Sequence, residues 1–123
     1  MTIYIYINNF LTTNWNKTKN GIISKKIISY SKFNSENYIY SIEAIGPTLT
    51  ASGANSRIKI ATDKGIRYLT PQECYLYMGF DNTDYQRVKN TQLLSNNKII
   101  YTAGNSIPIC ILESIFAALE FED

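Results

Sequence analysis

The chain has 123 residues, of which 45% are hydrophobic and 18% charged, and its formal net charge at neutral pH is +2. This length suits one modest globular domain and is too short for two ordinary ones. The sequence contains no histidine and two cysteines, which excludes an imidazole general base and leaves too few ligands for a Cys/His metal site. We expect Cys74 and Cys110 to be reduced core thiols of a cytoplasmic protein.

Charge is unevenly distributed along the chain. Nine basic and three acidic residues lie up to Arg67, a net +6, whereas three basic and seven acidic residues follow it, a net −4. The first part could therefore bind a polyanion such as DNA, and the second could not easily do so. A solvated basic face is the commoner cause of such a run, so charge alone leaves both interpretations open.

Residues 1–66 show the alternation and the β-branched and aromatic content of strands. We predict strands joined into hairpins by polar breaks, at residues 2–7, 21–31, 37–42 and 56–62. The loop before the last strand, GPTLTASGAN (46–55), is rich in small polar residues. Such a loop presents backbone amides and hydroxyls at a surface, which suits a close approach to phosphate.

The pattern becomes helical after this β-rich part. Thr70 occupies an N-cap position, Pro71 the first helical position, and Glu73 completes a capping box. Gly79 suits the position after the helix end, so we predict a short helix over residues 71–78.

Two further helices are expected near the end of the chain. One covers residues 96–103 and stops at Gly104. The other begins at Pro108 and carries an apolar stripe at steps of three and four, formed by Ile109, Leu112, Ile115, Phe116 and Leu119. The apolar run over residues 107–119 is shorter than the roughly 20 residues of a membrane span, so we expect a soluble protein. Apolar faces on three short helices require either very efficient packing or docking onto a partner.

Motifs of a complete enzyme are absent from the sequence. There is no phosphate-binding or dinucleotide glycine loop, no Gly-x-Ser-x-Gly elbow and no closely spaced carboxylate pair typical of a glycosidase or metal site. Neither cysteine has a base or cation placed to form a thiolate. Taken alone, the chain does not look like a complete enzyme.

Three stretches nevertheless resemble, in order, the C-terminal part of DNA cytosine-5 methyltransferases. IYSIEAIGPTLTASG (39–53) resembles the end of the target-recognition domain. RYLTPQECYLYMGFD (67–81) is similar to the ninth conserved motif, with its Arg-x-Leu-Thr-Pro-x-Glu start and Met-Gly-Phe end. LSNNKIIYTAGNSIPICILESIFAAL (94–119) is similar to the tenth, with Ala-Gly-Asn-Ser-Ile at a turn and a Leu-Glu-x-Ile helix after it.

The resemblance implies an α+β fold in two parts. Residues 1–66 would form a hairpin-rich target-recognition segment that binds DNA. Residues 67–123 would supply three short helices that complete a Rossmann-like methyltransferase domain and dock onto its catalytic part.

The resemblance also implies a cofactor, S-adenosylmethionine, bound in complex with a catalytic partner. Gly104, Asn105 and Ser106 match the tenth-motif turn that helps to close its pocket, with Gly104 permitting a tight turn. The start of the following helix would offer free amides and a positive dipole end to the carboxylate of the methionine part. The alternative is that Ser106 caps a helix and Asn105 turns the chain.

Double-stranded DNA is the second implied ligand. Thr48 and Leu49 match the family's Thr-Leu pair, where the hydroxyl meets a phosphate near the extruded base. The small-residue loop around them would lie along the major groove. The remaining candidates for DNA contact are Thr50, Ser52, Arg57 and Lys59, with Lys25 and Lys26 as further phosphate partners.

Three residues match positions that organise the domains. Arg67 resembles the ninth-motif arginine that ties the recognition domain to the catalytic domain, a role that suits the five donors of a guanidinium. Thr70 and Glu73 belong to the same motif.

The family's catalytic groups have no counterpart here, since the sequence holds no Pro-Cys pair, no Glu-Asn-Val run and no cofactor glycines after a first strand. Our first hypothesis is therefore the smaller, cytoplasmic subunit of a split methyltransferase, whose partners are DNA and a larger catalytic chain, without membrane or metal. The alternatives are a non-enzymatic DNA-binding or partner-binding module derived from such an enzyme, and a truncated remnant.

Overall fold

The computed structural model describes residues 11–51 and 57–119 and divides the chain into two compact units. The sheet unit comprises the residues up to Leu49 together with Gly53–Thr70. The helical unit comprises Thr50–Ser52 and the residues from Pro71 onward. Along the chain the boundary thus falls after Thr70 rather than after residue 66, because the last strand of the sheet extends to Tyr68.

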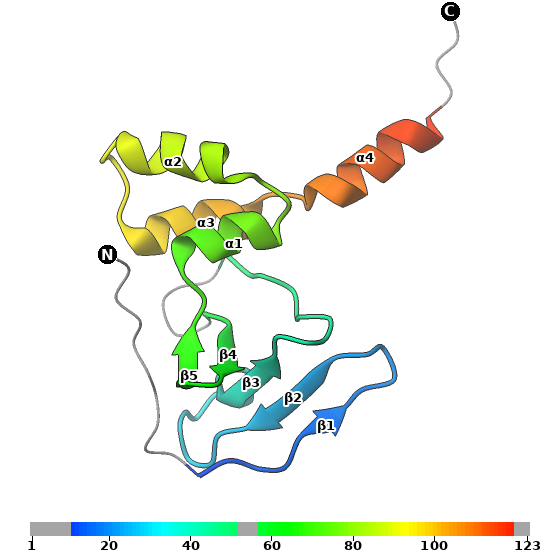
Figure 1. The fold of residues 1–123 in the computed structure, drawn as a ribbon, viewed down its shortest axis with the longest axis vertical. Coiled ribbons are helices and arrows are strands. Elements are labelled where there is room, and N and C mark those ends of the chain that lie inside the picture. The colour runs from blue at the N-terminus through cyan, green and yellow to red at the C-terminus, as the bar shows by residue number, and fades with distance from the viewer. Residues whose placement is uncertain (1–10, 52–56, 120–123) are drawn as a thin grey trace, which may run out of the picture. The chain divides into compact units, whose positions relative to one another are not determined.

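The sheet unit is a five-stranded mixed sheet (Figure 1). Its strands follow sequence order and are β1 (Asn16–Lys17), β2 (Ile23–Lys26), β3 (Tyr38–Ser41), β4 (Lys59–Thr62) and β5 (Gly65–Tyr68). β3 and β4 are parallel, and the other neighbours are antiparallel. A parallel pair needs a long crossover, and the connection between Ser41 and Lys59 that provides it carries the Thr48–Leu49 pair. A short 3-10 helix, η1 (Asn34–Asn37), precedes β3.

Three of the four predicted strands are confirmed as β2, β3 and β4, each shorter than predicted. The fourth, at residues 2–7, lies outside the described residues. β1 and β5 were not predicted, because β1 has only two polar residues and β5 follows its neighbour through a tight turn. In that turn the Thr62 hydroxyl donates to the carbonyl of Gly65 at 2.9 Å, and Gly65 has a φ of 136°.

The core of the sheet unit is formed by isoleucines from the strands and their flanks, with Leu69. Ile39 in β3 is fully buried, between the half-buried Tyr38 and Tyr40. The other buried apolar residues of the sheet proper are Ile27, Ile58, Ile60 and Leu69. Ser24 and Lys59 are the buried polar residues among the described ones.

Among its described residues the helical unit contains four helices, one more than predicted; Figure 1 labels them. They are α1 (Pro71–Tyr77), α2 (Asn82–Asn90), α3 (Asn96–Asn105) and α4 (Ile109–Ala118). The three predicted helices are confirmed as α1, α3 and α4, with shifted ends, and with them the α+β class. α2 was missed because it is polar and buries a single side chain, Tyr85. Its start is fixed by a capping box between Asp81 and Asp84.

Helices α1, α2 and α3 share a small core. It consists of Cys74, Tyr75, Met78, Tyr85, Ile99, Ile100 and Ala103. The ring of Tyr75 lies 5.4 Å from that of Phe80 and 5.9 Å from that of Tyr85, centroid to centroid. Its hydroxyl lies 2.8 Å from Oγ1 of Thr102, which donates to the carbonyl of Ile99. The tyrosine therefore joins three elements while its polar end stays hydrogen-bonded.

The end of α1 matches the prediction for Gly79. This glycine has a φ of 93°, and the amide of Phe80 donates to the carbonyl of Tyr75 at 3.0 Å. A left-handed glycine of this kind commonly closes a helix. The carbonyl of Met78 accepts from the amide of Ile109 at 3.0 Å, so the end of α1 also holds the start of α4.

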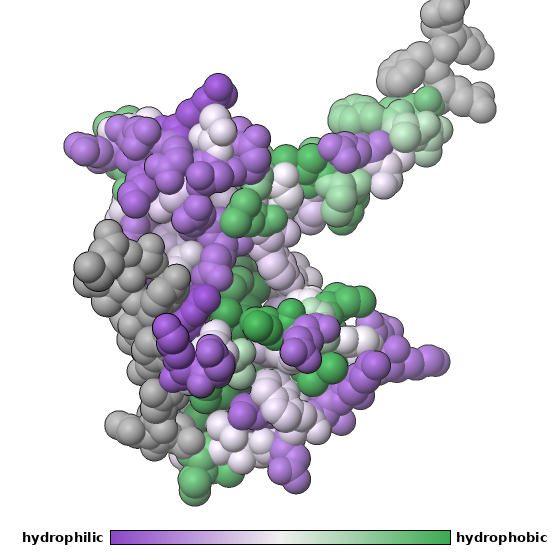
Figure 2. All heavy atoms as spheres, in the orientation of Figure 1, coloured by the Kyte–Doolittle hydropathy of each residue, from purple (hydrophilic) through white to green (hydrophobic). Residues whose placement is uncertain are grey.

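Helix α4 buries none of its residues in this chain. It extends away from α1–α3 in Figure 1, and Figure 2 shows hydrophobic residues along its surface. The exposed apolar side chains of this region are Ile107, Ile111, Ile115, Phe116 and Leu119, each about half exposed. Efficient internal packing, one of the two expectations for the apolar stripe, is therefore wrong for α4.

The two cysteines lie in different surroundings. Cys74 is 2% exposed in the α1–α3 core, as predicted. The same prediction for Cys110 is wrong, because α4 buries none of its residues and the thiol is exposed. Neither cysteine forms a disulfide with another described residue.

One stretch of the described residues, Asn96–Ala118, passes a length and composition test for a membrane span, which is weak evidence by itself. It is not one continuous helix, since α3 ends at Asn105 and α4 begins at Ile109. Its first half supplies Ile99, Ile100 and Ala103 to the core of the helical unit.

The exposure difference predicts different thiol reactivity. In the native chain alone, we expect a thiol reagent to modify Cys110 rapidly and Cys74 only after addition of denaturant. Peptide mass spectrometry after a timed labelling pulse distinguishes the two sites. Equal labelling rates under native conditions would contradict the described burial of Cys74.

Candidate DNA interface and cofactor turn

The predicted cofactor turn lies at the end of α3. Gly104 and Asn105 are the last two residues of this helix, and Ser106 is its C-cap. Gly104 is not among the described glycines with a positive φ and is itself helical, so the last turn of α3 stands where a tight turn was expected. The side chain of Asn105 is exposed. The hydroxyl of Ser106 donates to the carbonyl of Ala103 at 2.8 Å, which closes α3.

The start of α4 offers fewer amides than expected. Its N-cap residue, Pro108, provides no side-chain cap. The amide of Ile109 donates to Met78, and those of Ile111 and Leu112 donate to the carbonyl of Pro108 at 3.0 and 3.2 Å. Because these amides have acceptors within the chain, the side chain of Asn105 and the lone pairs of Ser106 become the better candidates for contacts with a cofactor.

The two residues of the Thr-Leu pair differ in exposure. Thr48 and Thr50 are exposed, whereas Leu49 is 5% exposed. Leu49 therefore anchors the segment, and its predicted contact with DNA does not fit this placement. The backbone of Thr50 and Ala51 lies directly against Gly104. Ser52 lies outside the described residues.

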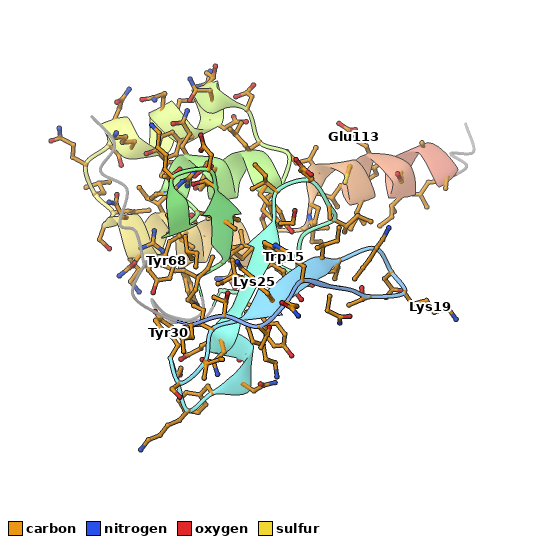
Figure 3. The ribbon with its side chains drawn as sticks, turned by 60° about the horizontal axis from the view of Figure 1, so that its bottom comes forward. Trp15, Lys19, Lys25, Tyr30, Tyr68 and Glu113 are labelled. Carbon is orange, nitrogen blue, oxygen red and sulfur yellow. The ribbon has the colours of Figure 1, made fainter. Side chains whose placement is uncertain are left out.

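The prediction that Lys59 neutralises phosphate does not fit its position in β4. Lys59 is 1% exposed, and its Nζ donates to the carbonyl of Glu36 at 2.7 Å. The same Nζ lies 5.0 Å from the ring centroid of Tyr30 and 5.3 Å from that of Tyr68. Burial lowers the pKa of Lys59, and the charge of Glu36 partly opposes this. The ammonium thus binds the η1 turn to the sheet (Figure 3 labels both tyrosines).

Arg57 is half-buried and contacts Tyr68, one of the two tyrosines next to Lys59. Its Nη2 donates to the carbonyl of Leu69 at 3.0 Å, and its guanidinium lies 5.0 Å from the ring centroid of Tyr68. Its Nε is buried and has no hydrogen-bond partner among the described residues. The hydroxyls of Tyr30 and Tyr68 share a short hydrogen bond. Burial, followed by this bond, raises the pKa of Tyr68. Arg57 is therefore held by the protein, like Lys59.

A basic hairpin, β1–β2, carries four lysines that are exposed or half-exposed. Its residues 14–26 contain four lysines and no acid, namely Lys17, Lys19, Lys25 and Lys26. The turn is closed by Thr18 and by Gly21, which has a φ of 92°. Lys25 Nζ lies 4.7 Å from the ring of Trp15, which is 46% exposed (Figure 3). Lys26 Nζ donates to Oδ1 of Asn34 at 2.9 Å.

Sequence reasoning selected Lys25 and Lys26 and missed Trp15, Lys17 and Lys19. The stretch NKTKNG (16–21) was treated as a break between strands, and Trp15 was not assigned to any element. The signal that could have found it is four lysines with an aromatic residue and no acid across a glycine turn. A two-stranded ribbon of this kind fits the major groove of DNA.

The three domain-organising candidates lie around the junction of β5 and α1. Arg67 pairs with Ile60 across the sheet, and its Nη1 donates to the carbonyl of Tyr68 at 3.1 Å. Thr70 immediately precedes α1, and Glu73 lies in its first turn. Their role in joining domains stays a prediction.

A family model described as C-5 cytosine-specific DNA methylase matches residues 2–120. The chain belongs to this family, as the resemblance implied.

Curated relatives agree with this membership. The orphan methyltransferase M.SssI of Spiroplasma monobiae is 49% identical over 112 residues, which are 89% of this chain and 29% of that protein. The orphan methyltransferase M.Rho11sI of Bacillus phage rho11s is 43% identical over 54 residues, 44% of this chain and 10% of that protein. The type II methyltransferase M2.ScrFI of Lactococcus lactis subsp. cremoris is 40% identical over 53 residues, which are 43% of this chain and 14% of that protein. The chain thus spans less than a third of each of these relatives.

The placement of Lys59 predicts a stability effect. Lys59→Met removes the donor to the Glu36 carbonyl, and we expect a loss of about 1–3 kcal/mol in the free energy of unfolding. Urea unfolding at neutral pH measures it. Lys19→Met is the matched control, since a substitution at an exposed hairpin lysine usually costs less than about 0.5 kcal/mol. Equal effects of the two substitutions would contradict the internal role of Lys59.

The difference in stability between the wild type and Lys59→Met should depend on pH. Because burial lowers the pKa of Lys59, the folded chain loses this proton at a lower pH than the unfolded chain, whose lysine titrates near 10.5. In the window between the lowered pKa and 10.5, the unfolded state binds more protons, so stability rises with pH. We expect the stability advantage of the wild type over Lys59→Met to grow across that window.

Proposed function

We propose that this chain is the DNA-recognition and pocket-completing part of an S-adenosylmethionine-dependent DNA cytosine-5 methyltransferase. It acts with a larger catalytic chain in the cytoplasm and is inactive without it. The observation that carries this proposal is the combination of a family match over residues 2–120 with a sequence that lacks the Pro-Cys and Glu-Asn-Val groups. The names of the relatives, orphan and type II methyltransferases, support a role of the restriction-modification type.

The catalytic partner would supply the chemistry that this chain lacks. In cytosine-5 methylation a cysteine thiolate adds to C6 of an extruded cytosine, so that C5 becomes nucleophilic toward the methyl group of S-adenosylmethionine. The residues of this chain would act around that reaction by holding DNA and by closing one side of the cofactor pocket.

The DNA contacts are proposed on two elements. The exposed hydroxyls of Thr48 and Thr50 can donate to phosphate oxygens, while the buried Leu49 fixes the segment between them. The basic hairpin provides four lysines for phosphate neutralisation, and Trp15 stiffens it by packing against Lys25. Lys59 and Arg57 are left out of this set because internal partners hold them.

The cofactor contacts are proposed at the end of α3. The exposed amide of Asn105 offers both a donor and an acceptor, and Ser106 can accept while its own proton is used by Ala103. Such groups suit the polar parts of S-adenosylmethionine.

Docking of the catalytic partner is proposed on α4. Its exposed apolar side chains are continuous with the cofactor turn along the chain, since three residues separate α3 from α4. Burial of one isoleucine or phenylalanine contributes about 1.5–3 kcal/mol, so a partner that covers Ile111, Ile115 and Phe116 would gain several such contributions.

Reconstitution tests the proposal. We expect transfer of a tritiated methyl group to duplex DNA only when this chain is mixed with a catalytic chain that contains the Pro-Cys and Glu-Asn-Val groups. In the mixture, Thr48→Ala should raise the KM for DNA about tenfold and Asn105→Ala the KM for S-adenosylmethionine about tenfold, each through a lost hydrogen bond of about 1.4 kcal/mol.

Labelling of Cys110 provides a readout of docking that does not depend on activity. Its modification should slow in the mixture, because α4 would be covered. DNA binding by this chain alone, with no activity or protection in any mixture, would support the non-enzymatic module. Aggregation of the isolated chain through α4 would support the remnant.

The salt dependence of DNA binding tests the basic hairpin. We expect Lys17→Gln and Lys19→Gln each to reduce the slope of log K against log salt concentration by about one. Fluorescence anisotropy at several salt concentrations measures this slope. Lys98→Gln, at an exposed lysine of α3, is the matched control and should leave the slope unchanged. Equal slopes for all four proteins would remove the hairpin from the interface.

A further inference from the structure

The helix α3 contains a glycine where backbone from a distant part of the chain approaches closely. A Cβ on Gly104 would lie 2.5 Å from the carbonyl oxygen of Thr50, 2.6 Å from its carbonyl carbon and 2.8 Å from the amide nitrogen of Ala51. Real Cβ atoms essentially never approach other atoms within 3.0 Å. All three neighbours are backbone atoms, so no flexible side chain can move aside.

The usual reason for a glycine near a helix end does not apply here. Gly104 lacks the positive φ seen at Gly79, and its place inside α3 makes it less favourable than alanine for backbone entropy. The missing side chain therefore serves the close approach of the Thr50–Ala51 backbone.

This contact lies within one compact unit. Thr50–Ser52 belong to the helical unit, although the residues before and after them belong to the sheet unit. On one side of the contact, Thr48 is two residues away along the chain. On the other side, Asn105 and Ser106 follow Gly104 directly. One backbone contact thus lies next to both candidate binding elements.

We propose that Gly104 is a positioning residue that seats the Thr50–Ala51 backbone, which follows Thr48 and Leu49 along the chain, on the end of α3 and thereby couples DNA binding to cofactor binding. The ligand assignments rest on the proposed function, whereas the contact itself does not. A segment held before DNA arrives loses less conformational entropy on binding. A cofactor that orders the end of α3 also orders the segment, so each ligand strengthens the binding of the other.

The contact is tested first in the chain alone with Gly104→Ala. An ordinary Gly→Ala change inside a helix raises stability. The direction of the change in melting midpoint therefore shows whether the close backbone contact is present. We expect a melting midpoint about 4 °C or more below the wild type and faster hydrogen exchange at Thr50 and Ala51. Asn97→Ala, at an exposed position of α3, is the control and should change neither. A raised midpoint with unchanged exchange would overturn the proposal.

A second variant covers the case in which Gly104→Ala does not fold. Ala51→Gly keeps glycine at 104 and loosens the segment that rests on it. We expect exchange at residues 48–51 to rise about threefold while exchange in α1 and α3 stays unchanged. Unchanged exchange of the segment would mean that the contact does not hold it.

The functional part uses the reconstituted mixture, at a temperature well below the melting midpoint of the variant. We expect Gly104→Ala to weaken DNA binding about tenfold with an unchanged salt slope, since no phosphate contact is removed. We also expect S-adenosylmethionine to tighten DNA binding in the wild type and not in the variant. A merely structural role would lower the midpoint without these changes.

The outcomes separate the two proposals. If the wild-type mixture binds no DNA, the proposed function fails. The melting and exchange results still test the contact between Gly104 and the Thr50–Ala51 backbone. If the wild-type mixture binds DNA and Gly104→Ala binds it equally well, with the same response to S-adenosylmethionine, the coupling fails alone.

Discussion

The apolar surface of α4 is the constraint on which the functional interpretation of this chain depends. The helical unit builds its core from α1, α2 and α3, and no residue of α4 is buried against them. Short chains bury a smaller share of their surface than long ones. In the helical unit, α4 is the helix that buries no residue. That helix follows the candidate cofactor turn directly. Under the proposed function, a partner that covers α4 would bind next to Asn105 and Ser106 along the chain.

The basic residues show how burial redistributes roles that composition suggests. In Arg57-Ile58-Lys59-Ile60, alternation would place the isoleucines inside and the cations outside. Ile58, Lys59 and Ile60 are nevertheless all buried. β4 lies between β3 and β5, and Lys59 is enclosed by Tyr30, Tyr68 and the η1 carbonyl. The Lys59 ammonium, which composition suggested as a DNA contact, thus stabilises the sheet unit instead. The exposed lysines of the β1–β2 hairpin are the better candidates for phosphate contacts.

Much of the fold could be predicted from the sequence, and what was missed has physical causes. Strong periodicity and helix signals at Pro71 and Gly79 located β2, β3, β4, α1, α3 and α4. The polar helix α2 shows no apolar stripe, because a single tyrosine provides its contact with the core. The parallel pairing of β3 with β4 depends on a crossover whose path no local pattern encodes. The site was reached through motif resemblance, since isolated Thr, Asn and Ser residues carry no signal of their own.

Gly104 illustrates what residue identity can and cannot decide. A glycine is required either where φ is positive or where backbone must approach closely, and the identity of residue 104 alone does not distinguish the two. The described geometry supports the second, because Gly104 is helical and the Thr50 carbonyl occupies the place of a side chain. The difference matters for function. A flexible turn would let the end of α3 and the Thr50–Ala51 backbone move independently, whereas the close backbone contact holds Thr50 and Ala51 against Gly104 within the helical unit.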